Sequence, residues 1–191
     1  SLNWVIKNRY IILFNEPNQA KEWGGRVNPK EYADILLAFS ESFKGKSEDF
    51  FILNAGFDAS APNSPPSFMD EYQFLLEMAQ YNPDIFNYLD GWASHSYPNP
   101  NFSASPNNRG KGSIRTFEWE LKTLKALGLK KTLPVFITET GWVHTSTNEK
   151  IVSNFFKQSF ETVWNKNNII AVTPFLLNYQ DHPFDTFSWR K

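Results

Sequence analysis

The chain of 191 residues contains no cysteine, which excludes disulfide bonds and thiolate metal sites. It also has no apolar run near the roughly 18 residues that a membrane-spanning helix requires. The N-terminus lacks the basic-then-apolar pattern of a signal peptide. We therefore expect a soluble globular protein with no membrane partner, while the sequence leaves its compartment open.

Neither sign of charge dominates the chain, because 19 Lys and Arg residues face 20 Asp and Glu residues and the basic ones are scattered. This pattern argues against a nucleic-acid partner. The three histidines, His95, His144 and His182, have no partner at the spacing of a metal site. No strand is followed by a glycine-rich turn of the dinucleotide or P-loop kind. The sequence thus predicts no metal and no cofactor.

Aromatic residues are the abundant class, at 17% of the chain with seven tryptophans. Most aromatic side chains in proteins fill cores or interfaces. Several here stand beside polar residues where strands are predicted to end. Flat apolar faces in such places are suited to sugar rings.

Five segments read as strands, and four helical patterns lie between them. The strand segments are almost uniformly apolar without alternation, which is typical of a parallel sheet covered on its outer face. They cover 10–18, 50–58, 89–97, 134–142 and 169–178. The helical patterns cover 28–44, 67–80, 113–128 and 147–166. Asn28 is the expected N-cap of the first, Pro29 its first residue and Gly128 the stop of the third.

The polar ends of the strand segments recur roughly every 40 residues, about one βα unit each. We place them at Asn15, Asn54, Ser94, Thr138 and Phe175. Alternating units of this kind predict an α/β fold, either an open doubly wound sheet or a closed barrel. Because no nucleotide-binding turn is present, we predict a parallel (β/α) barrel of TIM type, here a partial barrel of about five βα units forming one domain over 1–191.

A complete barrel takes about 250 residues, more than this chain supplies. We therefore expect the sequence to be a fragment, or a chain that another chain completes. A partial barrel leaves two strand edges unpaired. A second copy of the chain or a missing N-terminal segment is expected to pair those edges.

Glu16 and Glu139 both lie at the predicted carboxyl ends of strands, where active sites of parallel sheets and barrels are built. About three βα units separate them. If the sheet curves into a barrel, their side chains can converge across its mouth. Two carboxylates about 5 to 5.5 Å apart equip a retaining glycosidase, one as acid/base and the other as nucleophile.

The segments "FNEPN" (14–18) and "FITETGW" (136–142) resemble the fourth- and seventh-strand signatures of the clan A retaining glycoside hydrolases. This is the cellulase, mannanase and β-xylosidase group of (β/α)₈ enzymes. The resemblance implies that Glu16 is the general acid/base and Glu139 the nucleophile. It also implies that the chain covers the fourth to eighth strands, and the arginine that the family uses from an early strand has no counterpart here.

A third motif adds to the resemblance, because "HSY" (95–97) is similar to the His-x-Tyr of the family's sixth strand. By this resemblance Tyr97 hydrogen-bonds the nucleophile and His95 helps to line the subsite. Asn15 would hold the 2-hydroxyl of the sugar, a contact that strengthens in the transition state.

Three tryptophans are candidates for substrate binding. Trp23 and Trp142 lie on loops at the catalytic face, where each either stacks on a sugar or plugs its loop as a hydrophobic anchor. Trp189, in "FDTFSW", is a candidate for the family's eighth-strand tryptophan platform. The sequence leaves these alternatives open.

These residues together predict a retaining glycosidase that cleaves β-linked bonds of an oligo- or polysaccharide by double displacement. One alternative is a catalytically silent partial barrel that binds carbohydrate through its Trp and Tyr faces. Another is an open α/β sheet with a different hydrolase chemistry, which the lack of a Gly-x-Ser-x-Gly elbow and of a cysteine nucleophile disfavours.

Overall fold

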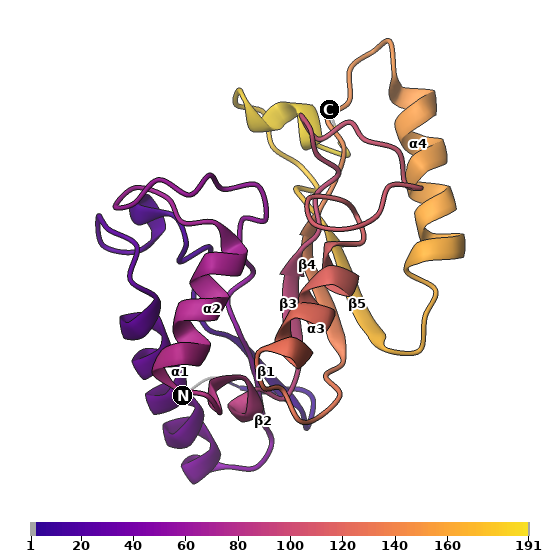
Figure 1. Ribbon diagram of the computed structural model, residues 1–191. Coiled ribbons are helices and arrows are strands. Elements are labelled where there is room, and N and C mark those ends of the chain that lie inside the picture. Colours follow the sequence, from indigo (N-terminus) through magenta and orange to yellow (C-terminus); the bar gives the residue numbers. More distant parts are fainter. Residues whose placement is uncertain (1–2, 191) are drawn as a thin grey trace. The chain divides into compact units, whose positions relative to one another are not determined.

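The computed structural model describes residues 3–190 as an α/β protein whose parallel strands form two sheets (Figure 1). The chain divides into two compact units. The first contains the residues up to Ala93 together with Leu121–Pro134, and the second contains Ser94–Glu120 and the residues from Val135 on. A single domain over 1–191 stays a prediction. Within residues 3–190, no helix is both long and apolar enough to cross a membrane.

The first unit is built on a pair of parallel strands with helices after each of them. Strand β1 (Arg9–Ile12) pairs with β2 (Phe50–Leu53), and α1 (Pro29–Lys46) connects them. Helix α2 (Glu71–Tyr81) follows β2 and packs against α1. An isolated parallel bridge joins Leu53 to Gly91, just before β3 (Trp92–His95). The predicted start of α1 is confirmed, because the Asn28 side chain accepts a hydrogen bond from the Glu31 backbone N–H at 3.2 Å.

The second unit contains the sheet β3-β4-β5 apart from the first half of β3. Strand β4 (Val135–Thr140) pairs in parallel with β5 (Ile169–Pro174), with register shifts along the pair. Helix α4 (Glu149–Gln158) precedes β5 and runs on into a π-helical turn at Ser159–Val163.

All five predicted strands and all four predicted helices are present in the described residues. Helix α3 (Thr116–Ala126) ends as predicted before Gly128, whose φ of 108° is readily adopted by glycine. Short 3₁₀ helices complete the fold at Ala20–Glu22, Ile85–Tyr88 and Phe184–Phe187. Closure of the strands into a barrel stays a prediction.

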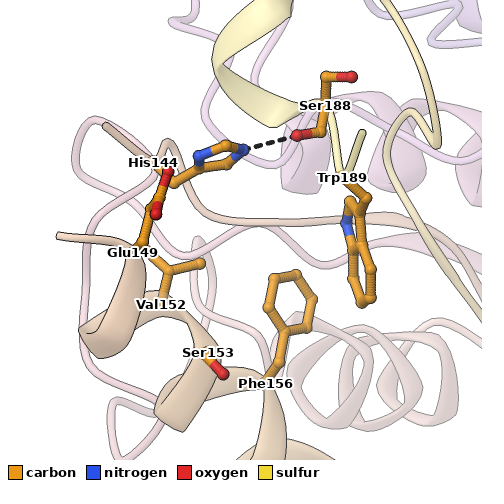
Figure 2. Close-up of a pocket in the computed structure, with 7 residues that line it drawn as sticks. All are labelled: His144, Glu149, Val152, Ser153, Phe156, Ser188 and Trp189. Carbon is orange, nitrogen blue, oxygen red and sulfur yellow. Dashed lines mark hydrogen bonds between the residues drawn. The ribbon is translucent and has the colours of Figure 1, made fainter. Parts of the chain in front are cut away.

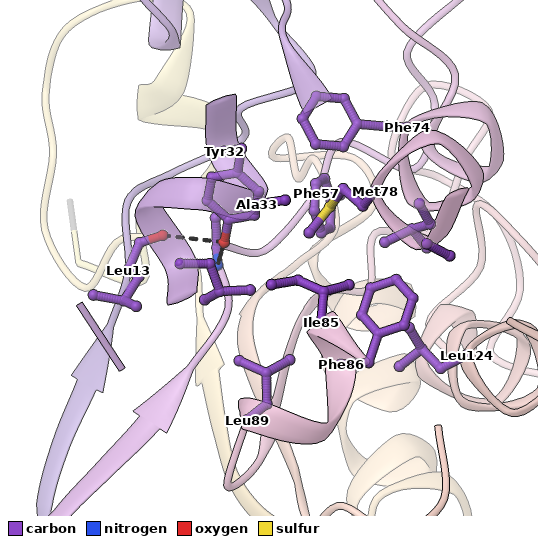
Figure 3. Close-up of a cluster of buried hydrophobic side chains, with 14 of the residues drawn as sticks. Leu13, Tyr32, Ala33, Phe57, Phe74, Met78, Ile85, Phe86, Leu89 and Leu124 are labelled. Carbon is purple, nitrogen blue, oxygen red and sulfur yellow. Dashed lines mark hydrogen bonds between the residues drawn. The ribbon is translucent and has the colours of Figure 1, made fainter. Parts of the chain in front are cut away.

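The core of the first unit lies between its strands and its helices (Figure 3). Its aromatic members interlock at their edges and faces, since Phe57 and Phe74 both contact the Tyr32 ring, with centroids 6.0 Å from it. Each of these side chains is fully buried. Truncation of such a residue typically costs about 3–5 kcal/mol, so this cluster contributes a large part of the stability of the unit.

The Tyr32 hydroxyl connects the ends of β1 and β2 from inside this core. It donates a hydrogen bond to the Leu13 carbonyl at 3.3 Å and accepts one from the Ala55 backbone N–H at 2.7 Å (Figure 3). Burial raises the pKa of Tyr32 well above its ordinary value, although the Ala55 hydrogen bond lowers it. The uncharged Tyr32 hydroxyl therefore fixes the end of β1, where the turn that carries Glu16 begins.

We expect Tyr32→Phe to destabilise the chain by about 1–3 kcal/mol, because it leaves the buried Ala55 N–H without its acceptor. An unfolded tyrosine ionises near pH 10, whereas folded Tyr32 keeps its proton to higher pH. Above about pH 10 the unfolded state therefore binds fewer protons, and this group lowers the stability by about 1.4 kcal/mol per pH unit. Urea unfolding of the unmodified chain and of Tyr32→Phe across this pH range measures the difference between their free energies of unfolding. If those free energies changed with pH in parallel, the prediction for Tyr32 would be contradicted.

Candidate functional site

In the second unit, hydrogen bonds between the ends of β3 and β4 bring the predicted nucleophile beside the His-x-Tyr motif. The Ser96 backbone N–H donates to the Glu139 carbonyl at 3.0 Å. The Thr140 hydroxyl donates to the Ser96 carbonyl at 2.7 Å. These contacts place the side chains of neighbouring strand ends on one edge of the sheet.

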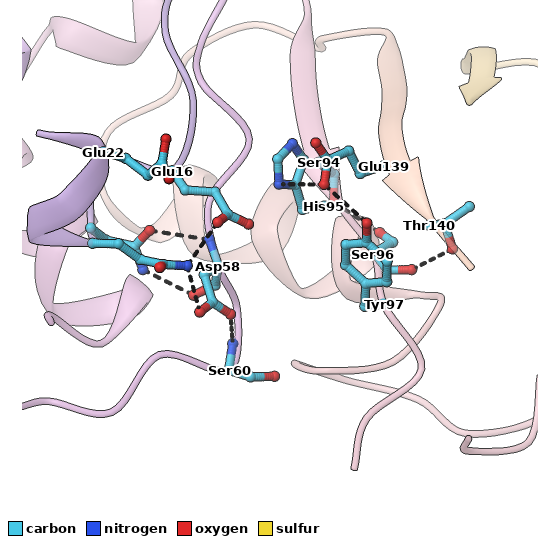
Figure 4. Close-up of polar contacts among 12 residues, drawn as sticks. Glu16, Glu22, Asp58, Ser60, Ser94, His95, Ser96, Tyr97, Glu139 and Thr140 are labelled. Atoms are coloured by element: carbon cyan, nitrogen blue, oxygen red, sulfur yellow. Dashed lines mark hydrogen bonds and ion pairs between the residues drawn. The ribbon is translucent and has the colours of Figure 1, made fainter. Parts of the chain in front are cut away.

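The Glu139 carboxylate accepts a hydrogen bond from the Tyr97 hydroxyl, with 3.0 Å between the Tyr97 oxygen and Glu139 Oε2 (Figure 4). His95 Nδ1 lies 3.6 Å from the same oxygen, longer than a hydrogen bond but close enough for an ion pair when the ring is protonated. The His95 side chain is buried, whereas 27% of the Glu139 side chain is exposed. The structure thus brings three of the predicted site residues together. Tyr97 and His95 lie beside the carboxylate of Glu139, which is exposed enough for a ligand to reach.

Three phenylalanines hold the Tyr97 ring in this orientation. Phe102, Phe175 and Phe187 meet it edge-on, with centroids 5.1, 6.1 and 6.2 Å away. Gly141 allows this packing, because a Cβ there would lie 3.3 Å from Phe187 Cδ1. The Tyr97 hydroxyl is therefore directed at Glu139 by packing as well as by its hydrogen bond.

In the first unit, Glu16 lies in a turn beyond the end of β1. Phe14 and Glu16 have φ values of 74° and 37°, a left-handed region that residues other than glycine adopt rarely. The Glu16 backbone N–H donates to the Gly56 carbonyl at 3.0 Å. The Asn15 side chain between them is exposed. Strained turns of this kind cluster at functional sites, which makes this turn a candidate for function.

The Glu16 carboxylate is linked through Gln19 to Asp58, and the sequence singled out neither of these two residues. Gln19 Nε2 donates to Glu16 Oε2 at 2.7 Å and to Asp58 Oδ2 at 3.0 Å. Figure 4 shows Glu16 and Asp58 in this cluster. Asp58 is the polar last residue of the second predicted strand segment (50–58). This position at a strand end is the sequence signal that could have identified Asp58 as a candidate site residue. Glu16 belongs to the first unit and Glu139 to the second, so their convergence stays a prediction.

Trp23 and Trp142 are both buried, at 9% and 2% exposure. The Trp23 indole N–H donates to Glu31 Oε2 at 3.0 Å, and its ring packs edge-on against Tyr32. The Trp142 indole N–H donates to the Ala104 carbonyl at 2.8 Å, and its ring packs against Phe156. Covered rings with satisfied N–H groups favour the hydrophobic-anchor alternative over sugar stacking for both tryptophans.

Trp189 is different, because 51% of it is exposed and it borders a cavity of about 460 Å³ in the second unit (Figure 2). Its ring packs against Phe156, with centroids 4.8 Å apart. His144 lines the same cavity, and its Nε2 makes a hydrogen bond of 2.7 Å with the Ser188 carbonyl. The other lining residues are Glu149, Val152 and Ser153. Of the predicted site residues, Trp189 lines this cavity.

Comparisons with known proteins give only distant likenesses among solved structures. No protein-family model matches the chain, and no curated protein matches its sequence. One matching solved structure is a family 51 α-L-arabinofuranosidase from Bifidobacterium longum, with 12% sequence identity and a TM-score of 0.45. The match covers 87% of this chain and 32% of that one, so this chain spans about a third of the length of that protein.

Proposed function

We propose that the chain carries the catalytic residues of a retaining glycoside hydrolase that cleaves β-linked bonds in an oligo- or polysaccharide. The observation that carries the proposal is the Glu139 carboxylate at the end of β4, partly exposed and hydrogen-bonded by Tyr97. A donor at this position favours the ionised carboxylate that a nucleophile requires. The motif order from Glu16 through His95 and Tyr97 to Glu139 supports the same reaction class.

The reaction takes two displacements at the anomeric carbon. In the first, a Glu139 oxygen forms a bond to this carbon, the glycosidic C–O bond breaks, and Glu16 donates its proton to the departing oxygen. In the second, Glu16 removes a proton from water while the water oxygen attacks the anomeric carbon and releases Glu139. The configuration is retained, and both glutamates return to their starting protonation states. Asn15 is assigned to the sugar 2-hydroxyl.

The proposed framework is a (β/α) barrel of TIM type, of which this chain supplies the fourth to eighth strands. In the described sheets, β1 pairs only with β2 and β5 only with β4. Each of these edge strands exposes a large apolar residue, Ile12 at 47% and Ile170 at 52%. Further strands, from a preceding segment or a second copy, would cover such edges.

The alternative function is carbohydrate binding without catalysis. The observation that favours it is the cavity beside Trp189, since an exposed indole face next to polar side chains is suited to a sugar ring. This alternative requires no convergence of carboxylates.

Labelling with 2-deoxy-2-fluoro aryl β-glycosides tests the proposed function. The fluorine slows both displacements and the activated aryl group restores the first, so the glycosyl-enzyme is expected to accumulate. We expect mass spectrometry to find the label on Glu139 in the unmodified chain and no label in Glu139→Gln. Labelling at another residue would overturn the assignment of Glu139. Oligosaccharide affinity with neither label nor turnover would favour the binding alternative.

A further inference from the structure

The cluster behind Glu16 suggests a residue that acts through the proposed acid/base. Both N–H groups of the Gln19 side-chain amide are used, one on Glu16 Oε2 at 2.7 Å and one on Asp58 Oδ2 at 3.0 Å. We propose that Gln19 is a positioning residue for Glu16 and that Asp58 holds Gln19 in place. This inference rests on the proposed function, because it concerns how Glu16 delivers its proton.

The chemistry of the partners fixes the direction of the bridge. An ionised carboxylate only accepts hydrogen bonds, so the NH₂ end of the amide is the end that faces the two acids. Hydrogen bonds to a charged acceptor are the stronger kind. An ionised Asp58 therefore anchors the amide and leaves its second N–H directed at Glu16.

Asp58 and Gln19 are themselves held by hydrogen bonds to neighbouring residues. The Asp58 backbone N–H donates to the side chain of Asn18 at 3.1 Å, and the Asn18 amide donates to the Asp58 carbonyl at 2.9 Å. The Ser60 backbone N–H donates to Asp58 Oδ1 at 2.8 Å. The Gln19 backbone N–H donates to the Glu16 carbonyl at 2.9 Å, and the residue is 8% exposed. The bridge is therefore held in place by residues of the chain itself.

This bridge decides which oxygen of Glu16 carries the proton. Gln19 directs an N–H at Oε2, so a proton on Oε2 would compete with that hydrogen bond. The protonated carboxyl therefore keeps Oε2 as the acceptor and carries its proton on Oε1. We assign Oε1 as the atom that donates to the departing glycosidic oxygen.

The catalytic test compares two leaving groups on the same sugar. Aryl β-glucosides, β-mannosides and β-xylosides are assayed as phenyl glycosides, which need a proton from the acid, and as dinitrophenyl glycosides, which do not. We expect Gln19→Leu and the isosteric Gln19→Glu to lower kcat/KM about 10- to 100-fold for the phenyl substrate, with little change for the dinitrophenyl one. Glu22→Gln is the control. It neutralises an exposed carboxylate that pairs with Lys21 at 3.6 Å and takes no part in the bridge. An equal loss on both substrates, or none, would overturn the proposal.

A second measurement does not depend on turnover and keeps Gln19 itself intact. The two side-chain amide protons of Gln19 are followed by NMR in the full chain. We expect Glu16→Gln to shift one of them and Asp58→Asn to shift the other, whereas Glu22→Gln shifts neither. Amide protons that respond to neither substitution would overturn the bridge. A chain that shows both shifts but hydrolyses none of the glycosides would retain the bridge and reject the proposed function.

Discussion

Glu139→Gln is expected to lower kcat/KM for aryl β-glycosides by at least about a thousandfold. The glutamine oxygen is uncharged and does not attack the anomeric carbon, so the first displacement loses its nucleophile. The substitution keeps the shape of the side chain and an acceptor for the Tyr97 hydroxyl. The loss is therefore expected without a change in folding. Initial rates on activated glycosides, beside circular dichroism of both chains, measure the two effects separately.

The matched control for this experiment is Glu161→Gln. Glu161 belongs to the same unit as Glu139 but is exposed on the π-helical turn that follows α4. The same chemical change there should leave the rate within about twofold, since surface substitutions of this kind rarely matter. Equal rates for the unmodified chain and Glu139→Gln would remove the catalytic role of Glu139.

The secondary structure was predictable because its signals are local. Strand β4 is an apolar run that ends in polar residues, and its burial follows from those residues alone. Asn28 and Pro29 mark the start of α1 through backbone geometry that needs no distant partner. The contact between Tyr97 and Glu139 was implied by the resemblance, and it is present in the structure.

The surroundings of the candidate site were not predictable, because they depend on side chains from distant segments. The sequence places Trp142 on a loop but does not reveal that Phe156 and the Ala104 carbonyl cover it. Gln19 and Asp58 are 39 residues apart, and only the packing beyond the ends of β1 and β2 brings them together. Such contacts obey no short-range periodicity, so a pattern of residues does not show them.

Glu16→Ala, unlike Glu139→Gln, is expected to affect substrates according to their leaving groups. Hydrolysis of phenyl glycosides should fall by about 10²- to 10⁴-fold, because the departing phenoxide is no longer protonated. Dinitrophenyl glycosides need no such proton, so their first displacement should proceed and the glycosyl-enzyme should accumulate. The second displacement is then slow, since no base activates the water.

Azide makes this prediction specific to an acid/base residue. It is already an anion, so it attacks the anomeric carbon without losing a proton, breaks the bond to Glu139 and yields a glycosyl azide of retained configuration. We expect azide to accelerate turnover of dinitrophenyl glycosides by Glu16→Ala but not by Glu22→Ala. A residue needed only for folding would not be rescued by a small anion. If azide leaves the rate of Glu16→Ala unchanged and no glycosyl azide forms, Glu16 is not the acid/base.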